Sequence, residues 1–290
     1  MPNYTTIIST SELQALQASG TPLKIFDCSF ELSQPDAGLA MFRDDRIAGA
    51  IYAHLDTALS AKTPELQASA ASGGRHPLPS REHVAEWLCN VGFDNSMQAV
   101  VYDRQGNNFC GRLWWMLKWV GHDNVAVLDG GLHAWQAAGG AMRSGPMPRH
   151  RAKTFVLQPS LVKLADVTSV QAHLGQTSQT LIDARGAVRF RGEQEPIDPV
   201  AGHIPGAINR PFTQNFDANG LFKPAAELRA EFETLLQGRD PATVVHHCGS
   251  GVSAVPNVLA MQIAGLGTTT LFAGSWSEWC SSPSRPVEKG

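Results

Sequence analysis

The chain has 290 residues, of which 43% are hydrophobic and 17% charged, and its formal net charge is -3. This length exceeds what a single hydrophobic core usually supports, so we expect two domains. The small net charge argues against nucleic acid or an anionic membrane as a partner. No apolar stretch approaches the roughly 20 residues of a membrane span, and the first residues lack the basic and apolar regions of a signal peptide. The composition therefore predicts a cytoplasmic globular protein.

Taken in chain order, the same signals occur twice. The first half contains LKIFDCS, RIAGAIYAHLD, AVVYDRQGN and VAVLDGGLHAW, and the second contains TLIDARG, GHIPGAINRPF, TVVHHCGSG and TTLFAGSWSEW. Asp27 and Asp183 lie 156 residues apart, and Trp135 and Trp279 lie 144 apart. Ordered matches at such similar offsets indicate a duplicated domain.

The two copies are predicted to be α/β domains. Short β-rich runs alternate with helical segments such as SREHVAEWLCNVG and AAELRAEFETLLQG, which favours a mainly parallel sheet flanked by helices. In such sheets, sites lie beyond the carboxyl ends of the strands. The segment AMRSGPMPRHRAKTFVLQPS has little apolar periodicity, so we place a first domain at 1–143, a linker at 144–160 and a second domain at 161–290.

One of the five cysteines lies in a context that suggests chemistry. An odd number of cysteines without CxxC spacing argues against a disulfide framework or a zinc cluster. Cys248, however, begins the loop CGSGVSA between an apolar run and a predicted helix near 252–264. Asp103 stands at the matching position of the first copy. We therefore expect one active site per chain, in the second copy.

The loop after Cys248 is suited to hold a negative charge. Gly249 and Gly251 permit positive φ, so the backbone N–H groups can turn inward as an anion-binding nest. The positive end of the following helix adds to this effect, and such surroundings lower a cysteine pKa from about 8.5 to roughly 3.5–7.5. A strand-to-helix turn with an incidental cysteine is the alternative interpretation.

Other readings of the loop fit less well. A phosphate-transfer C-x5-R loop needs arginine where Ala254 stands, and the Gly-Lys-Ser/Thr of a P-loop is absent. His246, His247 and Cys248 are neighbours on a strand, so their side chains alternate between faces and cannot converge on one metal ion. A cysteine hydrolase is thereby disfavoured.

The duplicated layout, DAR, GHIPGA, CGSGVSA and GSWSEW together resemble the rhodanese superfamily and, within it, the two-domain 3-mercaptopyruvate sulfurtransferases. The resemblance implies two tandem rhodanese-like domains, with an inactive first copy and a catalytic second one. It also implies that Cys248 takes a sulfur atom as a persulfide and passes it to cyanide or to an acceptor thiol, possibly one of a thioredoxin-like protein. No metal or organic cofactor is expected.

The resemblance also implies how a sulfur donor is bound. Thiosulfate-preferring relatives carry Arg and Lys directly after the cysteine, whereas this chain has the neutral Gly249 and Ser250. This difference favours the monoanion 3-mercaptopyruvate, released as pyruvate, over the dianion thiosulfate. The residues expected to bind the donor are Arg189, Gly249, Gly251, Val252 and Ser253.

Two features of the donor site depart from the family pattern or depend on the first half. Ile197 stands where relatives carry a second arginine, and Arg210 is either a compensating cation or a surface residue. The catalytic group expected by similarity is completed by Asp56 and His76 of the first half, which would act through Ser250. The alternatives left open are a thiosulfate sulfurtransferase and a non-catalytic persulfide- or anion-binding regulator.

Cys248→Ser should abolish sulfur transfer and leave the fold intact, because a serine hydroxyl at neutral pH cannot carry a sulfane sulfur. Mass spectrometry after treatment with the donor should find one added sulfur atom on the Cys248 peptide of the unmodified chain. The assignment is wrong if the added sulfur is found on any of the other thiols, Cys28, Cys89, Cys110 or Cys280.

Overall fold

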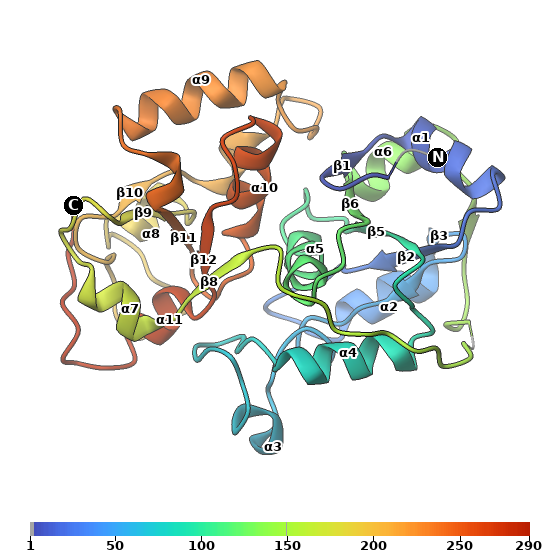
Figure 1. The fold of residues 1–290 in the computed structure, drawn as a ribbon, viewed down its shortest axis with the longest axis horizontal. Coiled ribbons are helices and arrows are strands. Elements are labelled where there is room, and N and C mark those ends of the chain that lie inside the picture. Colours follow the sequence, from blue (N-terminus) through green and yellow to red (C-terminus); the bar gives the residue numbers. More distant parts are fainter. Residues whose placement is uncertain (1–2, 149) are drawn as a thin grey trace. The chain divides into compact units, whose positions relative to one another are not determined.

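The structure is a computed structural model that describes residues 3–148 and 150–290. Residues 1 and 2, in the predicted first domain, and residue 149, in the predicted linker, lie outside the described residues. The chain forms two compact units (Figure 1). The first contains the chain up to Ser60, Pro79–Leu161 and Asn219–Leu221, and the second contains Ala61–Leu78, Val162–Ala218 and Phe222–Gly290. The predicted boundaries did not foresee that Ala61–Leu78 packs with the second unit.

The first unit is built on a parallel sheet of five strands in the order β1-β6-β5-β2-β4. These strands are β1 (Ile7–Ile8), β2 (Leu23–Asp27), β4 (Ile51–Tyr52), β5 (Gln98–Tyr102) and β6 (Val125–Leu128). A separate antiparallel pair joins β3 (Arg46–Ile47) to β7 (Met142–Arg143). The helices are α1 (Thr10–Ala18), α2 (Ala37–Asp44), α4 (Arg81–Asn90), α5 (Cys110–Trp119) and α6 (Gly131–Ala137).

The core of the first unit lies around β5 and α5, whose residues are all buried. Strand β5 pairs with β2 and β6, so it has neighbours on both edges and packs against α5 on one face. This explains why its sequence, QAVVY, is almost continuously apolar. Helices α1 and α4 begin with side-chain caps, as at Ser80, whose hydroxyl accepts the N–H of His83.

The second unit repeats this plan with five parallel strands in the order β10-β9-β11-β12-β8. The strands are β8 (Lys163–Ala165), β9 (Thr180–Asp183), β10 (Ile208–Asn209), β11 (Val244–His247) and β12 (Thr270–Phe272). The α-helices are α3 (Pro64–Gln67), α7 (Val167–Ala172), α8 (Ala187–Phe190), α9 (Ala225–Leu236), α10 (Val255–Ile263) and α11 (Ser275–Trp279). Two 3-10 helices, η1 (Phe212–Asn215) and η2 (Pro241–Thr243), complete the unit. Two parallel sheets flanked by helices confirm the predicted fold class.

The register of the second sheet positions the cysteine loop. His247, the last residue of β11, lies opposite Asp183, the last residue of β9. Cys248 therefore emerges at the carboxyl edge of the sheet, where sites of parallel sheets lie. Helix α10, which packs on β11 and β12 and carries α9 on its outer side (Figure 1), begins at Val255 and leaves 248–254 as loop. The helix expected from residue 252 therefore begins three residues later, at Val255.

In the first unit, the loop at the matching position surrounds the carboxylate of Asp103. Asp103 is 1% exposed and follows β5. Its Oδ1 accepts the N–H groups of Gln105 and Asn107, both at 2.9 Å, and its Oδ2 accepts those of Phe109 at 2.8 Å and Cys110 at 2.9 Å. Four backbone donors converging on one side chain make this loop an anion-binding nest whose anion is part of the chain.

The two loops have the same outline. Gly106 and Gly251 each lie three residues after the end-of-strand position, with φ of 67° and 72°. Helices α5 and α10 each begin seven residues after Asp103 and Cys248. The second unit therefore presents its thiol where the first presents a carboxylate.

Asp103→Ala should destabilise the first unit by about 3 kcal/mol or more, because three buried N–H groups and one part-buried N–H group lose their acceptor together. Chemical denaturation measures this loss of unfolding free energy. Asp36→Ala is the control, because Asp36 is exposed and its side chain caps no N–H group at the start of α2. Equal stability of the two variants would contradict a structural role for the Asp103 carboxylate.

Candidate functional site

Cys248 is held by contacts between its backbone and the start of α11. The residue is 1% exposed. Its N–H donates to Ser275 Oγ at 3.1 Å, and its carbonyl accepts the N–H of Trp276 at 3.0 Å. The carbonyl of Gly249 accepts the N–H of Ser277 at 2.8 Å. The predicted GSWSEW motif thus fixes the first two residues of the cysteine loop.

The two loop glycines are needed for different reasons. Gly251 has φ of +72°, and a β-carbon at this residue would collide with the carbonyl of Ala273. Gly249 does not have the positive φ that the sequence suggested, so that expectation is wrong. A β-carbon at Gly249 would instead lie 3.1 Å from Nη2 of Arg75 and 3.6 Å from Nη1 of Arg189. The missing side chain at Gly249 makes room for two guanidinium groups.

The segment 73–76 is anchored to α11 within the second unit. The N–H of Gly73 donates to Glu278 Oε1 at 3.1 Å, and the N–H of Arg75 donates to Ser277 Oγ at 2.9 Å. Gly74 between them has φ of +87° and lies against the Gly274 carbonyl, so a side chain there would be strained. These contacts fix the backbone on which the next residue, His76, is carried.

His76 and Ser250 lie in hydrogen-bond contact. His76 Nδ1 is 2.8 Å from Ser250 Oγ, and both residues are buried. Two of the three catalytic residues expected besides the thiol are thereby placed beside each other, one of them two residues after Cys248. Asp56 follows β4 in the first unit, where its N–H donates to His54 Nδ1 at 3.0 Å. Orientation of His76 by Asp56 stays a prediction.

Two of the expected donor-binding residues occupy the far part of the loop. Val252 is 4% exposed, and its carbonyl accepts the N–H of Val255, which starts α10. Ser253 is partly exposed and lies between them. Their positions continue the loop from Gly251 to the helix, and a direct role in binding stays a prediction.

Two arginines and two carboxylates form a network beside the loop. Arg189 donates through Nη2 to Glu195 Oε1 at 2.7 Å and to Asp198 Oδ2 at 3.1 Å, and through Nε to Glu195 Oε2 at 3.2 Å. Asp198 Oδ1 accepts a hydrogen bond from Nη1 of Arg75. The same two guanidinium groups face Gly249, so the network reaches the residue directly after the thiol.

Arg75 is a site residue that sequence reasoning missed. The only local signal is its place directly before His76 in GGRHPLP. Ile197, which stands where a second arginine was expected, is 43% exposed, and its N–H donates to Glu195 Oε1. A second guanidinium is therefore supplied from a segment that lies about 120 residues earlier in the chain.

The two carboxylates of this network differ in their proton affinity. Burial by itself would raise the pKa of Glu195, but the hydrogen bonds from Arg189 and from two backbone N–H groups lower it below its ordinary value. For Asp198, burial outweighs the opposing effect of Arg75 and Arg189, and the pKa is raised. Glu195 is thus the firmly ionised partner of Arg189.

The remaining arginines of this region have structural partners. Arg185 is buried, binds both carboxylate oxygens of Asp183, and lies over the ring of Trp276 at 4.8 Å. Arg191 forms an exposed ion pair with the neighbouring Glu193. Arg185 therefore has a structural role, and Arg191 lies at the surface.

Arg210 is not the surface residue that the sequence favoured. It is 4% exposed, its Nη2 donates to Glu231 Oε2 at 2.7 Å, and its guanidinium lies 4.2 Å from the centre of the Phe232 ring. It therefore attaches the end of β10 to α9. Its burial could not be foreseen because Glu231 and Phe232 lie about 20 residues later in the chain.

The other buried thiols are poorly suited to act as nucleophiles. Burial raises the pKa of Cys28 and Cys110, and the carboxylate of Asp103 raises both further. Burial also raises the pKa of Cys280. All five cysteines are free thiols. Cys248 remains the one thiol that stands at the carboxyl edge of a sheet beside two guanidinium groups.

Metal-ligand groups and membrane-spanning helices are both absent among the described residues, 3–148 and 150–290. Within them, no group of three or more His, Cys, Asp or Glu side chains is arranged to hold a metal ion. Among the same residues, no helix is long and apolar enough to cross a membrane.

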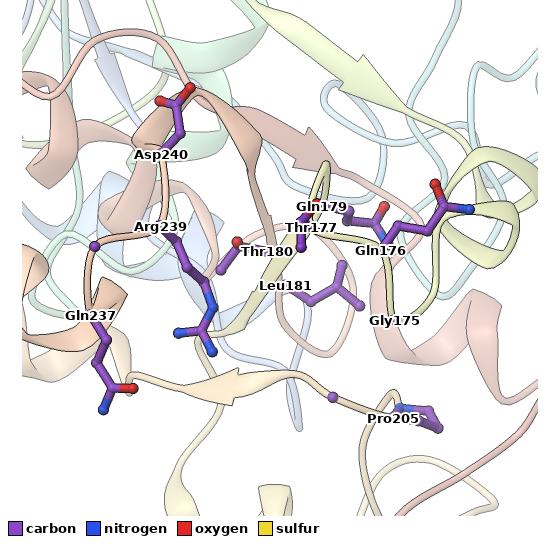
Figure 2. A pocket seen from close by; sticks show the side chains of 12 residues that line it. Gly175, Gln176, Thr177, Gln179, Thr180, Leu181, Pro205, Gln237, Arg239 and Asp240 are labelled. Carbon is purple, nitrogen blue, oxygen red and sulfur yellow. The ribbon is translucent and has the colours of Figure 1, made fainter.

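A cavity of about 540 Å³ opens at the opposite edge of the second sheet (Figure 2). It is lined by the residues that lead into β9 and β11, including Gln179 and Arg239. None of the predicted site residues lines it. Because it lies at the amino ends of the strands, it is separate from the loop that carries the thiol.

Comparison with known protein families identifies the family of the chain. The model of the rhodanese-like domain matches residues 9–138 and 166–282. The chain belongs to this family. Each matched region contains four of the five strands of one parallel sheet, as expected for a rhodanese-like protein with two copies of the fold.

Similar proteins carry sulfurtransferase names. A Pseudomonas aeruginosa protein named as a probable 3-mercaptopyruvate sulfurtransferase is 43% identical, with 97% of each chain covered. An Arabidopsis thaliana protein named thiosulfate/3-mercaptopyruvate sulfurtransferase 2 is 30% identical over 91% of this chain and 81% of its own. The solved 3-mercaptopyruvate sulfurtransferase from Leishmania major has a TM-score of 0.79 and 31% identity, covering 96% of this chain and 74% of its own. These findings confirm that this rhodanese-like protein is a sulfurtransferase enzyme.

Proposed function

We propose that this sulfurtransferase takes its sulfur from 3-mercaptopyruvate, holds it as a persulfide on Cys248, and releases pyruvate. The hydrogen bond between His76 and Ser250, 2.8 Å long and two residues from the thiol, is the observation that carries this choice of donor. A hydroxyl polarised by an imidazole is useful for a donor whose leaving carbon must be protonated.

The first step forms an S–S bond and breaks a C–S bond. The Cys248 thiolate attacks the donor sulfur, and the electron pair of the C–S bond passes into the enolate of pyruvate. Ser250, hydrogen-bonded to His76, contacts the donor carbonyl oxygen and stabilises the charge that develops there. Protonation of the enolate carbon then gives pyruvate, and the sulfur remains as the terminal atom of the Cys248 persulfide.

The loop is proposed to stabilise the anionic sulfur. In the first unit, the equivalent loop directs four N–H groups at the Asp103 carboxylate. The matching glycine conformation and helix start indicate that the loop around Cys248 can surround a thiolate or a persulfide anion in the same way.

The donor carboxylate is proposed to bind the guanidinium groups of Arg75 and Arg189. Both flank Gly249, one residue from the nucleophile. Guanidinium groups donate two parallel hydrogen bonds to a carboxylate, which fixes its orientation as well as its charge. The pair therefore holds the donor with its sulfur near Cys248.

In the second step, an acceptor takes the terminal sulfur. An acceptor thiolate attacks the outer sulfur, the S–S bond breaks, and the Cys248 thiolate is regenerated. The acceptor is proposed to be a thiol, such as that of a thioredoxin-like protein, or cyanide. A cytoplasmic location and a persulfide intermediate remain parts of this proposal.

Thiosulfate is the second candidate donor. The observation that favours it is the pair of cations beside Gly249, because two guanidinium groups also suit a small dianion. The Arabidopsis relative carries both donor names. Sulfite, the group that leaves from thiosulfate, has no carbon that must be protonated. Thiosulfate would therefore not use Ser250 as an acid or a polarising group.

Ser250→Ala and His76→Ala should each slow pyruvate release roughly 10²–10⁴-fold. The first change removes the hydroxyl, and the second removes the imidazole that polarises it. Turnover of thiosulfate by the same proteins should change little. The double variant should lose little more than either single one, because the two residues act as a unit. Strictly additive losses, or equal damage with both donors, would contradict the proposed use of 3-mercaptopyruvate.

Arg75→Ala should raise KM for 3-mercaptopyruvate roughly 10- to 100-fold and affect kcat less, because it removes a charge-assisted contact to the carboxylate. Initial rates of pyruvate formation measure both constants. Arg191→Ala is the matched control, because Arg191 follows the same short helix as Arg189 but is exposed. A fall in kcat at unchanged KM would instead mean that Arg75 serves only to place His76.

A further inference from the structure

Asp198 occupies a central place in the charged network and has no role in the mechanism above. One of its carboxylate oxygens bonds to Arg75 and the other to Arg189. Its side chain is only 4% exposed, and that of Glu195 only 3%. The carboxylate thus bridges the two groups that are proposed to bind the donor.

Each guanidinium has one side on Asp198 and another beside the cysteine loop. Arg75 uses Nη1 toward Asp198, while its Nη2 is the atom nearest to Gly249. Arg189 uses Nη2 toward Asp198, and its Nη1 and Nη2 lie 3.6 and 3.7 Å from the point where a β-carbon of Gly249 would stand. An anion beside Gly249 can therefore contact both arginines without displacing Asp198, but it lies across the guanidinium groups from a fixed negative charge.

The charges of the network cancel. Arg75 and Arg189 contribute two positive charges, and Glu195 and Asp198 contribute two negative ones. Arg185, which also contacts Glu195 at 3.4 Å, is balanced by its ion pair with Asp183. We propose that Asp198 sets the charge preference of the donor site, admitting a monoanionic carboxylate and disfavouring a dianion. This inference rests on the proposed function, because it takes Arg75 and Arg189 as the donor's binding groups.

Coulomb repulsion explains the preference. The interaction between two charges is proportional to their product, so the repulsion from Asp198 is twice as large for a dianion as for a monoanion. At roughly 5 Å and an effective dielectric of about 20 to 40, the penalty for a monoanion corresponds to about 10-fold or more in affinity. The penalty for a dianion then corresponds to about 100-fold or more, so removal of the charge must change the ratio of the two affinities.

Asp198→Asn tests the proposal because it keeps an oxygen acceptor and removes the charge. This substitution is placed in a Cys248→Ser background, where no sulfur transfer occurs, and binding is measured by calorimetry. The probes are 3-hydroxypyruvate, a monoanion without a transferable sulfur, and thiosulfate, a dianion. We expect Asp198→Asn to bind 3-hydroxypyruvate about 10-fold more tightly and thiosulfate about 100-fold more tightly than the background protein.

Two controls accompany this measurement. Glu193→Gln removes the same charge from the same segment, but Glu193 is exposed and pairs only with Arg191, so both affinities should stay unchanged. Asp198→Glu keeps the charge and should retain the preference for the monoanion. Thermal unfolding checks that each variant is folded, and the ratio of the two dissociation constants from one sample does not depend on its folded fraction.

Several outcomes would overturn the inference. If Asp198 serves only as a structural bridge, Asp198→Asn weakens binding of both anions. Equal tightening for monoanion and dianion, or no binding of either probe to the background protein, also contradicts it. Pyruvate formation by the chain with Cys248 intact is assayed separately. Its presence together with an unchanged ratio would reject the role of Asp198 while leaving the proposed function standing.

Discussion

The loop between a central strand and the following helix is the constraint on which both units depend, and in the first unit its inward N–H groups need an acceptor. In the first unit the acceptor is the carboxylate of Asp103, which receives four backbone hydrogen bonds. In the second, the loop has the same glycine conformation and helix start but carries a thiol. One residue thus separates a loop whose N–H groups bond to its own carboxylate from a loop that presents a thiol at the same position.

The residues around the thiol supply the charged side chains that the loop sequence lacks. Helix α11 receives hydrogen bonds from the loop and from the segment 73–76 and so places them side by side. That segment brings His76 to Ser250 and Arg75 to Asp198. The neutral loop sequence therefore does not mean that charged groups are absent beside the thiol. Arg75 and Arg189 lie next to Gly249, and Asp198 bridges them.

Local patterns in the sequence predicted the features that are repeated along the chain. Strand runs ending at Asp183 and His247, followed by loop and helix, are enough to place Cys248 at the carboxyl edge of a parallel sheet. Local patterns failed where long-range contacts decide. Gly249 does not have positive φ, and its missing side chain instead leaves room for Arg75 and Arg189. Arg210 is buried because Glu231 and Phe232 receive its guanidinium.

The sequence by itself determined the duplicated α/β fold and pointed to Cys248 and its loop as the candidate site, because these depend on residues close together in the chain and on a periodicity that repeats. Only the tertiary structure decided that Ala61–Leu78 packs with the second unit and that Arg75 joins Arg189 beside the thiol. The physical reason is distance along the chain. Arg75 and Asp198 are separated by 123 residues, and no local pattern records a contact that forms only when two distant segments pack together.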